Sequence, residues 1–97
     1  RWIQVRMKHV TSRERLHTAG LIASLCRQYE AICIINDHVD VASAVNAHGV
    51  HLGRLDGSWR EARAAIGREM ILGGTINNQD DARRAVRAQC LDYVGIG

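Results

Sequence analysis

The sequence predicts a fold of the α/β class because strand-like and helix-like segments alternate along it. A short apolar run, a polar or glycine-rich segment and a pattern of helical spacing follow one another four times, and a fifth apolar run comes after them. Strands that alternate with helices form βαβ units, whose right-handed crossovers lay successive strands parallel and side by side. No proline and no Gly/Ser-rich or single-charge stretch marks a linker. We therefore expect residues 1–97 to form one domain, or part of one.

The first run, residues 2–8, alternates apolar and polar side chains with the period of a strand. The alternation places Ile3, Val5 and Met7 on one face and Gln4, Arg6 and Lys8 on the other. One interpretation is a solvated edge strand of an antiparallel sheet. The βα context favours a parallel sheet, in which both faces are covered and two buried cations would need an anion. A bound pyrophosphate would supply that charge.

The next elements are a helix, a strand, a short helix and a strand. Thr11 and Glu14 have the spacing of a capping box, and the apolar spacing after them predicts a long helix up to about Tyr29. Residues 31–35 are continuously apolar, which is typical of a strand covered on both faces. We expect a short helix over about 40–47, capped by Asp40, and a third strand over 49–53.

The second half of the chain repeats this order. Ser58 and Glu61 form another capping box, which predicts a helix to about Ile66, ended by Gly67. Residues 70–75 read as the fourth strand and residues 92–97 as the fifth. Asn77 or Asn78 would cap the helix between them.

Five parallel strands fit an open sheet or an arc of a (β/α)8 barrel. The dinucleotide fingerprint G-x-G-x-x-G is missing after the first strand, which favours the barrel arc. Such a barrel usually needs about 200 residues or more. We therefore expect the chain to be a fragment that holds about half of a single barrel domain.

Composition and charge narrow the function classes. The chain is 46% hydrophobic and 24% charged, which indicates a globular protein. No apolar run approaches the roughly 18 residues that a membrane span needs, and residues 1–4 do not resemble a signal peptide. The net charge of +3 comes from scattered arginines with few aromatic residues, a poor match to a nucleic-acid surface. Arginine suits phosphate, so an anionic small substrate fits better, and we expect neither nucleic-acid nor membrane partners.

The three cysteines are an odd number without a C-x-x-C pair. This favours a reducing compartment, here the cytoplasm, and no disulfide framework. Cys26, Cys33 and Cys90 occupy apolar positions and are interpreted as small core residues rather than nucleophiles. His48 and His51 have a spacing found in some zinc sites, but residues three apart on a strand face opposite sides, so no zinc site is expected.

Polar residues follow three of the expected strands at their carboxyl ends, where barrel enzymes place their sites. Asn36 and Asp37 come directly after the second strand, and Asp56 follows the third. Two carboxylates on neighbouring strand ends suit Mg²⁺, which completes its shell with water and phosphate oxygens. The alternatives are that Asp37 caps the next helix and that Asp56 belongs to a turn. Thr75 ends the fourth strand after two glycines, which would allow a ligand to approach the backbone.

Five segments, taken together, resemble the thiamine-phosphate synthase family. They are residues 3–8 (IQVRMK), 34–42 (IINDHVDVA), 49–53 (GVHLG) with Asp56, 71–77 (ILGGTIN) and 92–97 (DYVGIG). The family is a (β/α)8 barrel that joins a hydroxymethylpyrimidine diphosphate to a thiazole phosphate with loss of pyrophosphate. By the resemblance, this chain covers strands two to six of that barrel. The full enzyme would be a transferase, and the 97 residues alone would be inactive.

The resemblance also implies roles for the residues named above. By the resemblance, the residues that contact the pyrimidine diphosphate are Gln4, Arg6, Lys8, Asn36 and Thr75. The residues that bind Mg²⁺ are Asp37 and Asp56. Arg6 and Lys8 would also act in catalysis, because cations and metal stabilise charge on the departing pyrophosphate. No protein nucleophile or general base is implied.

Two other functions remain open. The first is a thiazole tautomerase like the family's paralogues, against which Asp56 argues, since that branch can lack the second carboxylate. The second is a non-catalytic α/β fragment that binds phosphate. Exposed strand edges would also favour pairing with a partner, such as another copy of the chain.

Overall fold

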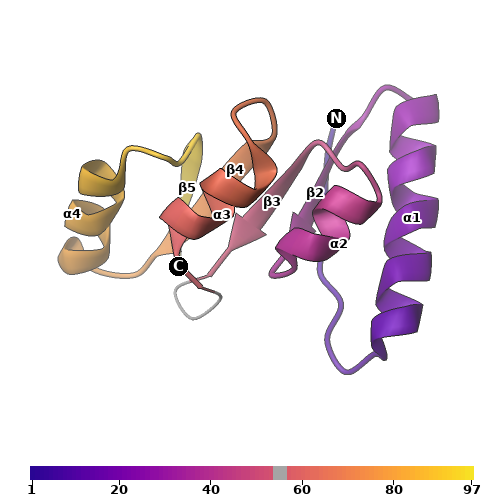
Figure 1. Cartoon of the computed structure of the whole chain (residues 1–97), viewed down its shortest axis with the longest axis horizontal. Coiled ribbons are helices and arrows are strands. Elements are labelled where there is room, and N and C mark those ends of the chain that lie inside the picture. Colours follow the sequence, from indigo (N-terminus) through magenta and orange to yellow (C-terminus); the bar gives the residue numbers. More distant parts are fainter. Residues whose placement is uncertain (54–56) are drawn as a thin grey trace.

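The computed structural model describes residues 1–53 and 57–97. It contains five strands and four helices that alternate along the chain (Figure 1). The elements are β1 (Trp2–Val5), α1 (Ser12–Gln28), β2 (Ile32–Asn36), α2 (Val39–Ala44), β3 (Gly49–Leu52), α3 (Trp59–Ile66), β4 (Ile71–Ile76), α4 (Gln79–Ala88) and β5 (Tyr93–Ile96). The α/β class and the predicted order of elements are confirmed.

The five strands form a single parallel sheet in the order β1-β2-β3-β4-β5. Each strand therefore pairs with the strand before it and the strand after it, as a chain of βαβ units predicts. The helices follow one another along one side of this sheet, from α1 at one end to α4 at the other (Figure 1). Every carboxyl end of a strand points to the same edge of the sheet.

The hydrophobic core lies between the sheet and these helices. Residues paired across parallel strands share a face, and successive residues alternate between faces. The helix-covered face carries the buried side chains of Val5, Cys33, Ile35, Val50, Leu52 and Leu72, against Ala19, Ala23, Cys26, Val41, Ala42, Trp59 and Ala62 of the helices. The opposite face of the sheet carries none of the four helices. That asymmetry leaves the second face available for the polar residues.

Three of the helices begin at side-chain caps. Thr11 Oγ1 accepts the Glu14 N–H at 3.1 Å, and Ser58 Oγ accepts the Glu61 N–H at 3.3 Å. Asn78 Oδ1 accepts the N–H of the buried Asp81 at 2.8 Å. Each cap satisfies one of the free amides of the first turn, and together they confirm the predicted starts of α1, α3 and α4.

Two local expectations are wrong. Residues 2–8 do not form one strand, because β1 ends at Val5 and Arg6 and Lys8 are exposed in the segment after it. The expected cost of burying these cations therefore does not arise in this chain. Asp40 does not cap α2: the helix begins at Val39 with His38 as its N-cap, and Asp40 lies in the first turn. A carboxylate in the first turn interacts favourably with the positive end of the helix dipole, although it does not cap the helix.

Among the described residues, none of the helices has the length and apolar character needed to cross a membrane.

Candidate functional site

The helix-free face of the sheet carries a row of residues in register across four strands. Asn36 of β2 pairs with His51 of β3, His51 with Gly73 of β4, and Gly73 with Tyr93 of β5. Because residues in register share a face, all four side-chain positions lie on the same side. Thr75, two residues beyond Gly73, lies on that side too.

His51 is the centre of a hydrogen-bonded cluster on this face. Its imidazole is buried, with 9% of the residue exposed. The Nδ1 atom lies 2.8 Å from the Tyr93 hydroxyl, and Nε2 lies 2.7 Å from Thr75 Oγ1. Burial raises the pKa of the Tyr93 phenol, and a hydrogen bond from Gln4 partly opposes that shift. Tyr93 therefore keeps its proton at neutral pH and can donate it.

Contacts across this face join the first strand to the last. The rings of Trp2 on β1 and Tyr93 on β5 meet edge to face, with centroids 5.3 Å apart and planes at 86°. Gln4 of β1 also bonds to Tyr93. A flat sheet would separate the outer strands by about four strand spacings of roughly 4.8 Å each, so the sheet is strongly curled around the helix-free face. This curvature is that of a barrel arc.

The carboxyl end of β2 presents two oxygen-bearing side chains. Asn36 Oδ1 is buried and, among the described residues, has no hydrogen-bond partner, a situation that costs about 1–3 kcal/mol. Asp37 follows with φ 73°, in the left-handed region, and its N–H donates to the His51 carbonyl at 2.9 Å. Asp tolerates this conformation better than most residues, yet it remains unusual there. The orphaned oxygen and the unusual backbone both point to a ligand position.

The predicted site residues are only partly brought together. Gln4 and Thr75 join the cluster through Tyr93 and His51, and Asn36 is the register neighbour of His51. Arg6 and Lys8 lie beyond the end of β1, exposed and with no contact described. Asp56 lies outside the described residues.

The two glycines of β4 have a different role from the one predicted. A Cβ atom on Gly73 would overlap the Tyr93 ring, and a Cβ on Gly74 would come within 2.9 Å of the Trp59 indole. Both positions are thus filled by aromatic side chains of this chain, one on each face of the sheet. Packing, rather than a ligand's approach to the backbone, accounts for these glycines.

The donor chemistry at the end of β2 is compatible with Mg²⁺. Carboxylate and amide oxygens are ligands that this cation accepts, and it usually takes only one or two from the protein. Within residues 1–53 and 57–97, no group of three or more His, Cys, Asp or Glu could enclose a metal ion. A cation held by Asp37 would complete its shell with oxygens of water, of the substrate or of residues outside these ranges, such as the predicted second ligand Asp56.

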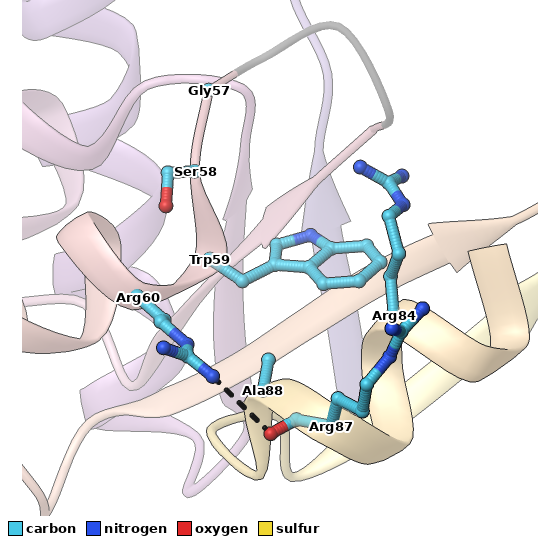
Figure 2. A pocket seen from close by; sticks show the side chains of 7 residues that line it. All are labelled: Gly57, Ser58, Trp59, Arg60, Arg84, Arg87 and Ala88. Atoms are coloured by element: carbon cyan, nitrogen blue, oxygen red, sulfur yellow. Dashed lines mark hydrogen bonds between the residues drawn. The ribbon is translucent and has the colours of Figure 1, made fainter.

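A second concave region lies on the helix side, between α3 and α4 (Figure 2). This pocket of about 350 Å³ is lined by Gly57, Ser58, Trp59, Arg60, Arg84, Arg87 and Ala88. The Arg84 guanidinium lies 5.4 Å from the Trp59 ring centre, and Arg60 donates to the Arg87 carbonyl at 3.3 Å. None of the predicted substrate or metal residues that fall within residues 1–53 and 57–97 lines it. We assign the candidate site to the helix-free face instead.

His51 and Tyr93 are the residues that the sequence analysis missed. The one role that the sequence suggests for the His51 side chain is that of a zinc ligand with His48, whereas the structure has His48 exposed, with its Nδ1 accepting the Cys33 N–H at 2.9 Å. A usable signal was present: His51 is the one polar residue in a strand that is otherwise apolar or glycine, in residues 49–52. Polar residues in such strands need a partner.

Comparison with known proteins gives one consistent result. A family model described as thiamine monophosphate synthase matches residues 1–97. A thiamine-phosphate synthase from Phocaeicola vulgatus is 42% identical over 97 residues, which are 100% of this chain and 46% of the relative. The corresponding protein from Flavobacterium johnsoniae is 43% identical over 96 residues, 99% of this chain and 45% of the relative.

A solved structure shares the fold. The thiamine phosphate pyrophosphorylase from Pyrococcus furiosus matches with a TM-score of 0.88 and 34% identity, over 99% of this chain and 46% of that one. The predicted partial α/β barrel is thereby confirmed. The chain spans about half the length of the relatives it matches.

Proposed function

The chain belongs to the thiamine monophosphate synthase family, and from that premise we propose that its protein couples a hydroxymethylpyrimidine diphosphate with a thiazole phosphate. The products would be thiamine phosphate and pyrophosphate, which makes the enzyme a transferase of thiamine biosynthesis. By resemblance, the chain supplies strands two to six of the barrel. The observation that carries the proposal is the convergence of Gln4, Asn36 and Thr75 on the helix-free face.

Each side chain on that face has a physical task in this reaction. Thr75 would donate its hydroxyl to a phosphate oxygen, and the buried Asn36 Oδ1, which lacks a partner among the described residues, would accept from the substrate. Gln4, at the opposite side of the curled face, would contact the pyrimidine diphosphate as well. These contacts hold the substrate in one orientation, which lowers the entropic part of the barrier.

Arg6 and Lys8 follow the carboxyl end of β1 and would reach the diphosphate from that edge. Cations placed there stabilise the negative charge that grows on pyrophosphate as it leaves. The thiazole nitrogen would then capture the pyrimidine carbocation, so no protein nucleophile is needed. Mg²⁺, when bound by Asp37 and Asp56, would neutralise further diphosphate charge.

Asp37→Asn is the sharpest test of the metal assignment. Asn also tolerates the left-handed backbone that Asp37 adopts at φ 73°, so the substitution removes a charge while preserving local conformation. In the full-length protein we expect Mg²⁺-dependent pyrophosphate release to fall by about 100-fold or more, the upper end of losses seen around metal sites. Release is measured with a coupled pyrophosphate assay across a Mg²⁺ titration.

Asp40→Asn is the matched control, because it makes the same chemical change at an exposed residue in the first turn of α2. It should leave pyrophosphate release within about twofold of the unaltered protein. Near-normal activity in Asp37→Asn would reject Asp37 as a metal ligand. A protein that releases no pyrophosphate but isomerises a thiazole phosphate would favour the tautomerase alternative.

Cytoplasmic localisation also belongs to this proposal. Its support is that Cys26, Cys33 and Cys90 are all free thiols, which suits a reducing compartment.

A further inference from the structure

The hydrogen bonds around His51 can run in either of two directions, depending on which ring nitrogen carries the proton. A neutral imidazole donates from one nitrogen and accepts at the other, and the partner of each nitrogen decides which tautomer is present. Here the partners are the Tyr93 hydroxyl at Nδ1 and Thr75 Oγ1 at Nε2. Both partners are hydroxyl groups, so the direction depends on what else each hydroxyl contacts.

Tyr93 is already supplied with a donor on its oxygen. The Gln4 side chain bonds to the phenol in a manner that lowers its pKa, as a donor to that oxygen does. Burial keeps the phenol protonated. With the Tyr93 O–H directed at His51 Nδ1, that nitrogen accepts and Nε2 carries the imidazole proton.

Thr75 Oγ1 accepts the hydrogen bond that His51 Nε2–H then donates. No other hydrogen bond to Thr75 Oγ1 is seen among the described residues. With Nε2–H directed at its oxygen, the Thr75 hydroxyl hydrogen is turned away from His51. In the opposite tautomer the Thr75 hydroxyl would donate its hydrogen to His51 Nε2. It would then present only lone pairs to the substrate side, and these repel an anion.

We propose that Tyr93 and His51 are positioning residues that orient the Thr75 hydroxyl as a hydrogen-bond donor to a phosphate oxygen of the substrate. The chain of donors runs from Gln4 to Tyr93, to His51, to Thr75 and then to the anion. It crosses from β1 through β5 and β3 to β4. This inference rests on the proposed function for the identity of the anion, but the direction of the chain can be measured without substrate.

The first test is the ¹⁵N spectrum of the imidazole in the full-length protein, because protonated and unprotonated ring nitrogens differ widely in chemical shift. We expect Nε2 of His51 to be protonated and Nδ1 unprotonated. Tyr93→Phe keeps the ring that packs over Gly73 and against Trp2 but removes the hydroxyl. It should convert a single tautomer into a mixture. Tyr29→Phe, the same change at an exposed residue that ends α1, should leave the spectrum unchanged.

The second test measures inorganic pyrophosphate binding by calorimetry in the presence of Mg²⁺. Thr75→Val should weaken binding by about tenfold or more, as expected for a lost bond to a charged acceptor. Tyr93→Phe should weaken it by about threefold, because the donor is no longer held in one orientation. The double variant should bind no more weakly than Thr75→Val alone, because Tyr93 acts through Thr75.

The outcomes separate the two proposals. An unprotonated Nε2, an unchanged tautomer in Tyr93→Phe, or additive losses in the double variant would overturn this inference even where pyrophosphate binds and the enzyme is active. Failure of the unaltered protein to bind pyrophosphate would overturn the proposed function and, with it, the assignment of the anion.

Discussion

Cys33 shows how burial, aided by a neighbouring thiol, lowers the reactivity of a cysteine. It is fully buried in the helix-side core, and its pKa is raised from 9.0 to about 11, first by that burial and then by the neighbouring Cys26. At a given pH below both values, a rise from 9.0 to about 11 lowers the thiolate fraction by about 100-fold. The sequence interpretation of this cysteine as a small core residue agrees with its position.

Alkylation should therefore distinguish the cysteines. In folded protein at pH 8, iodoacetamide should modify the half-buried Cys90 well before Cys33, since only the thiolate reacts. Peptide mapping by mass spectrometry gives the two rates, and labelling in urea is the control that should abolish the difference. Comparable rates in the folded state would contradict the burial and the raised pKa of Cys33.

At the same scale, the polar residues of the helix-free face were predictable but their partners were not. Gln4, Asn36 and Thr75 could be selected because polar side chains on the covered strands of a parallel sheet need a hydrogen-bonding partner. The bond between His51 and Tyr93 joins residues 42 positions apart, and no local pattern encodes such a contact. Strand periodicity gives the face of a residue, whereas its partner depends on register and curvature.

The elements were predictable wherever their ends are set locally. The caps at Thr11, Ser58 and Asn78 use side chains within three residues of their partners, so their signatures appear in the sequence. Strand ends depend on pairing with a neighbour, which explains why the alternation of residues 2–8 overstated the length of β1. Asp40 was misassigned for a related reason, since several polar residues precede α2 and any of them could have been its cap.

Arg63 of α3 bonds to several segments of the chain at once, and no local pattern in the sequence indicates these contacts. Its guanidinium donates to the carbonyls of Gly67, Met70 and Cys90 and to Asp92 Oδ2, at 2.7–2.9 Å. The same Asp92 oxygen accepts the Leu72 N–H at 2.8 Å. Burial would raise the pKa of Asp92, but the bonds from Arg63 and Leu72 outweigh it and hold that pKa below the ordinary value of 3.8.

This lowered pKa predicts a pH dependence. The Asp92 carboxylate stabilises the fold at pH values above its unfolded pKa, and the contribution is lost as pH falls through the lower folded pKa. Asp92→Asn should reduce the free energy of unfolding at pH 7 by about 1 kcal/mol, a modest loss because the carboxylate is half exposed. Urea titrations at pH 7 and in acid should show the two proteins converging in acid.

Asp80→Asn serves as the control for that comparison. Asp80 also pairs with an arginine, Arg83 at 2.7 Å, but its side chain is 86% exposed. Its removal should not change the unfolding midpoint measurably at either pH. A pH-independent deficit in Asp92→Asn would show that packing, rather than charge, accounts for the loss.

At the scale of the whole molecule, the class and strand order followed from the alternation of elements, since a right-handed βαβ chain leaves few alternatives. The degree of curl did not follow. It is visible only in contacts between the outermost strands, such as Trp2 with Tyr93, which no period-two pattern specifies. The choice of a barrel arc over an open sheet depended on a missing motif and on the resemblance, and the structure of the Pyrococcus relative supports it.

Hydrogen exchange should report this architecture in the chain from Arg1 to Gly97. Central strands β2, β3 and β4 each pair on both sides and carry the most buried residues, so their amides should exchange slowest. Amides of β1 and β5, which pair on one side within this chain, should exchange faster. Mass spectrometry of peptic peptides measures the order. Faster exchange in β3 than in β1 would contradict the sheet described.

Gly73 and Tyr93 occupy one shared volume, because the phenol ring fills the space that a methyl group at position 73 would require. Any lineage that gains a side chain at 73 must therefore shrink or redirect the side chain at 93, and with it the hydroxyl beside His51. Evolutionary freedom at a glycine with no chemistry of its own is thus restricted by a neighbour on the adjacent strand.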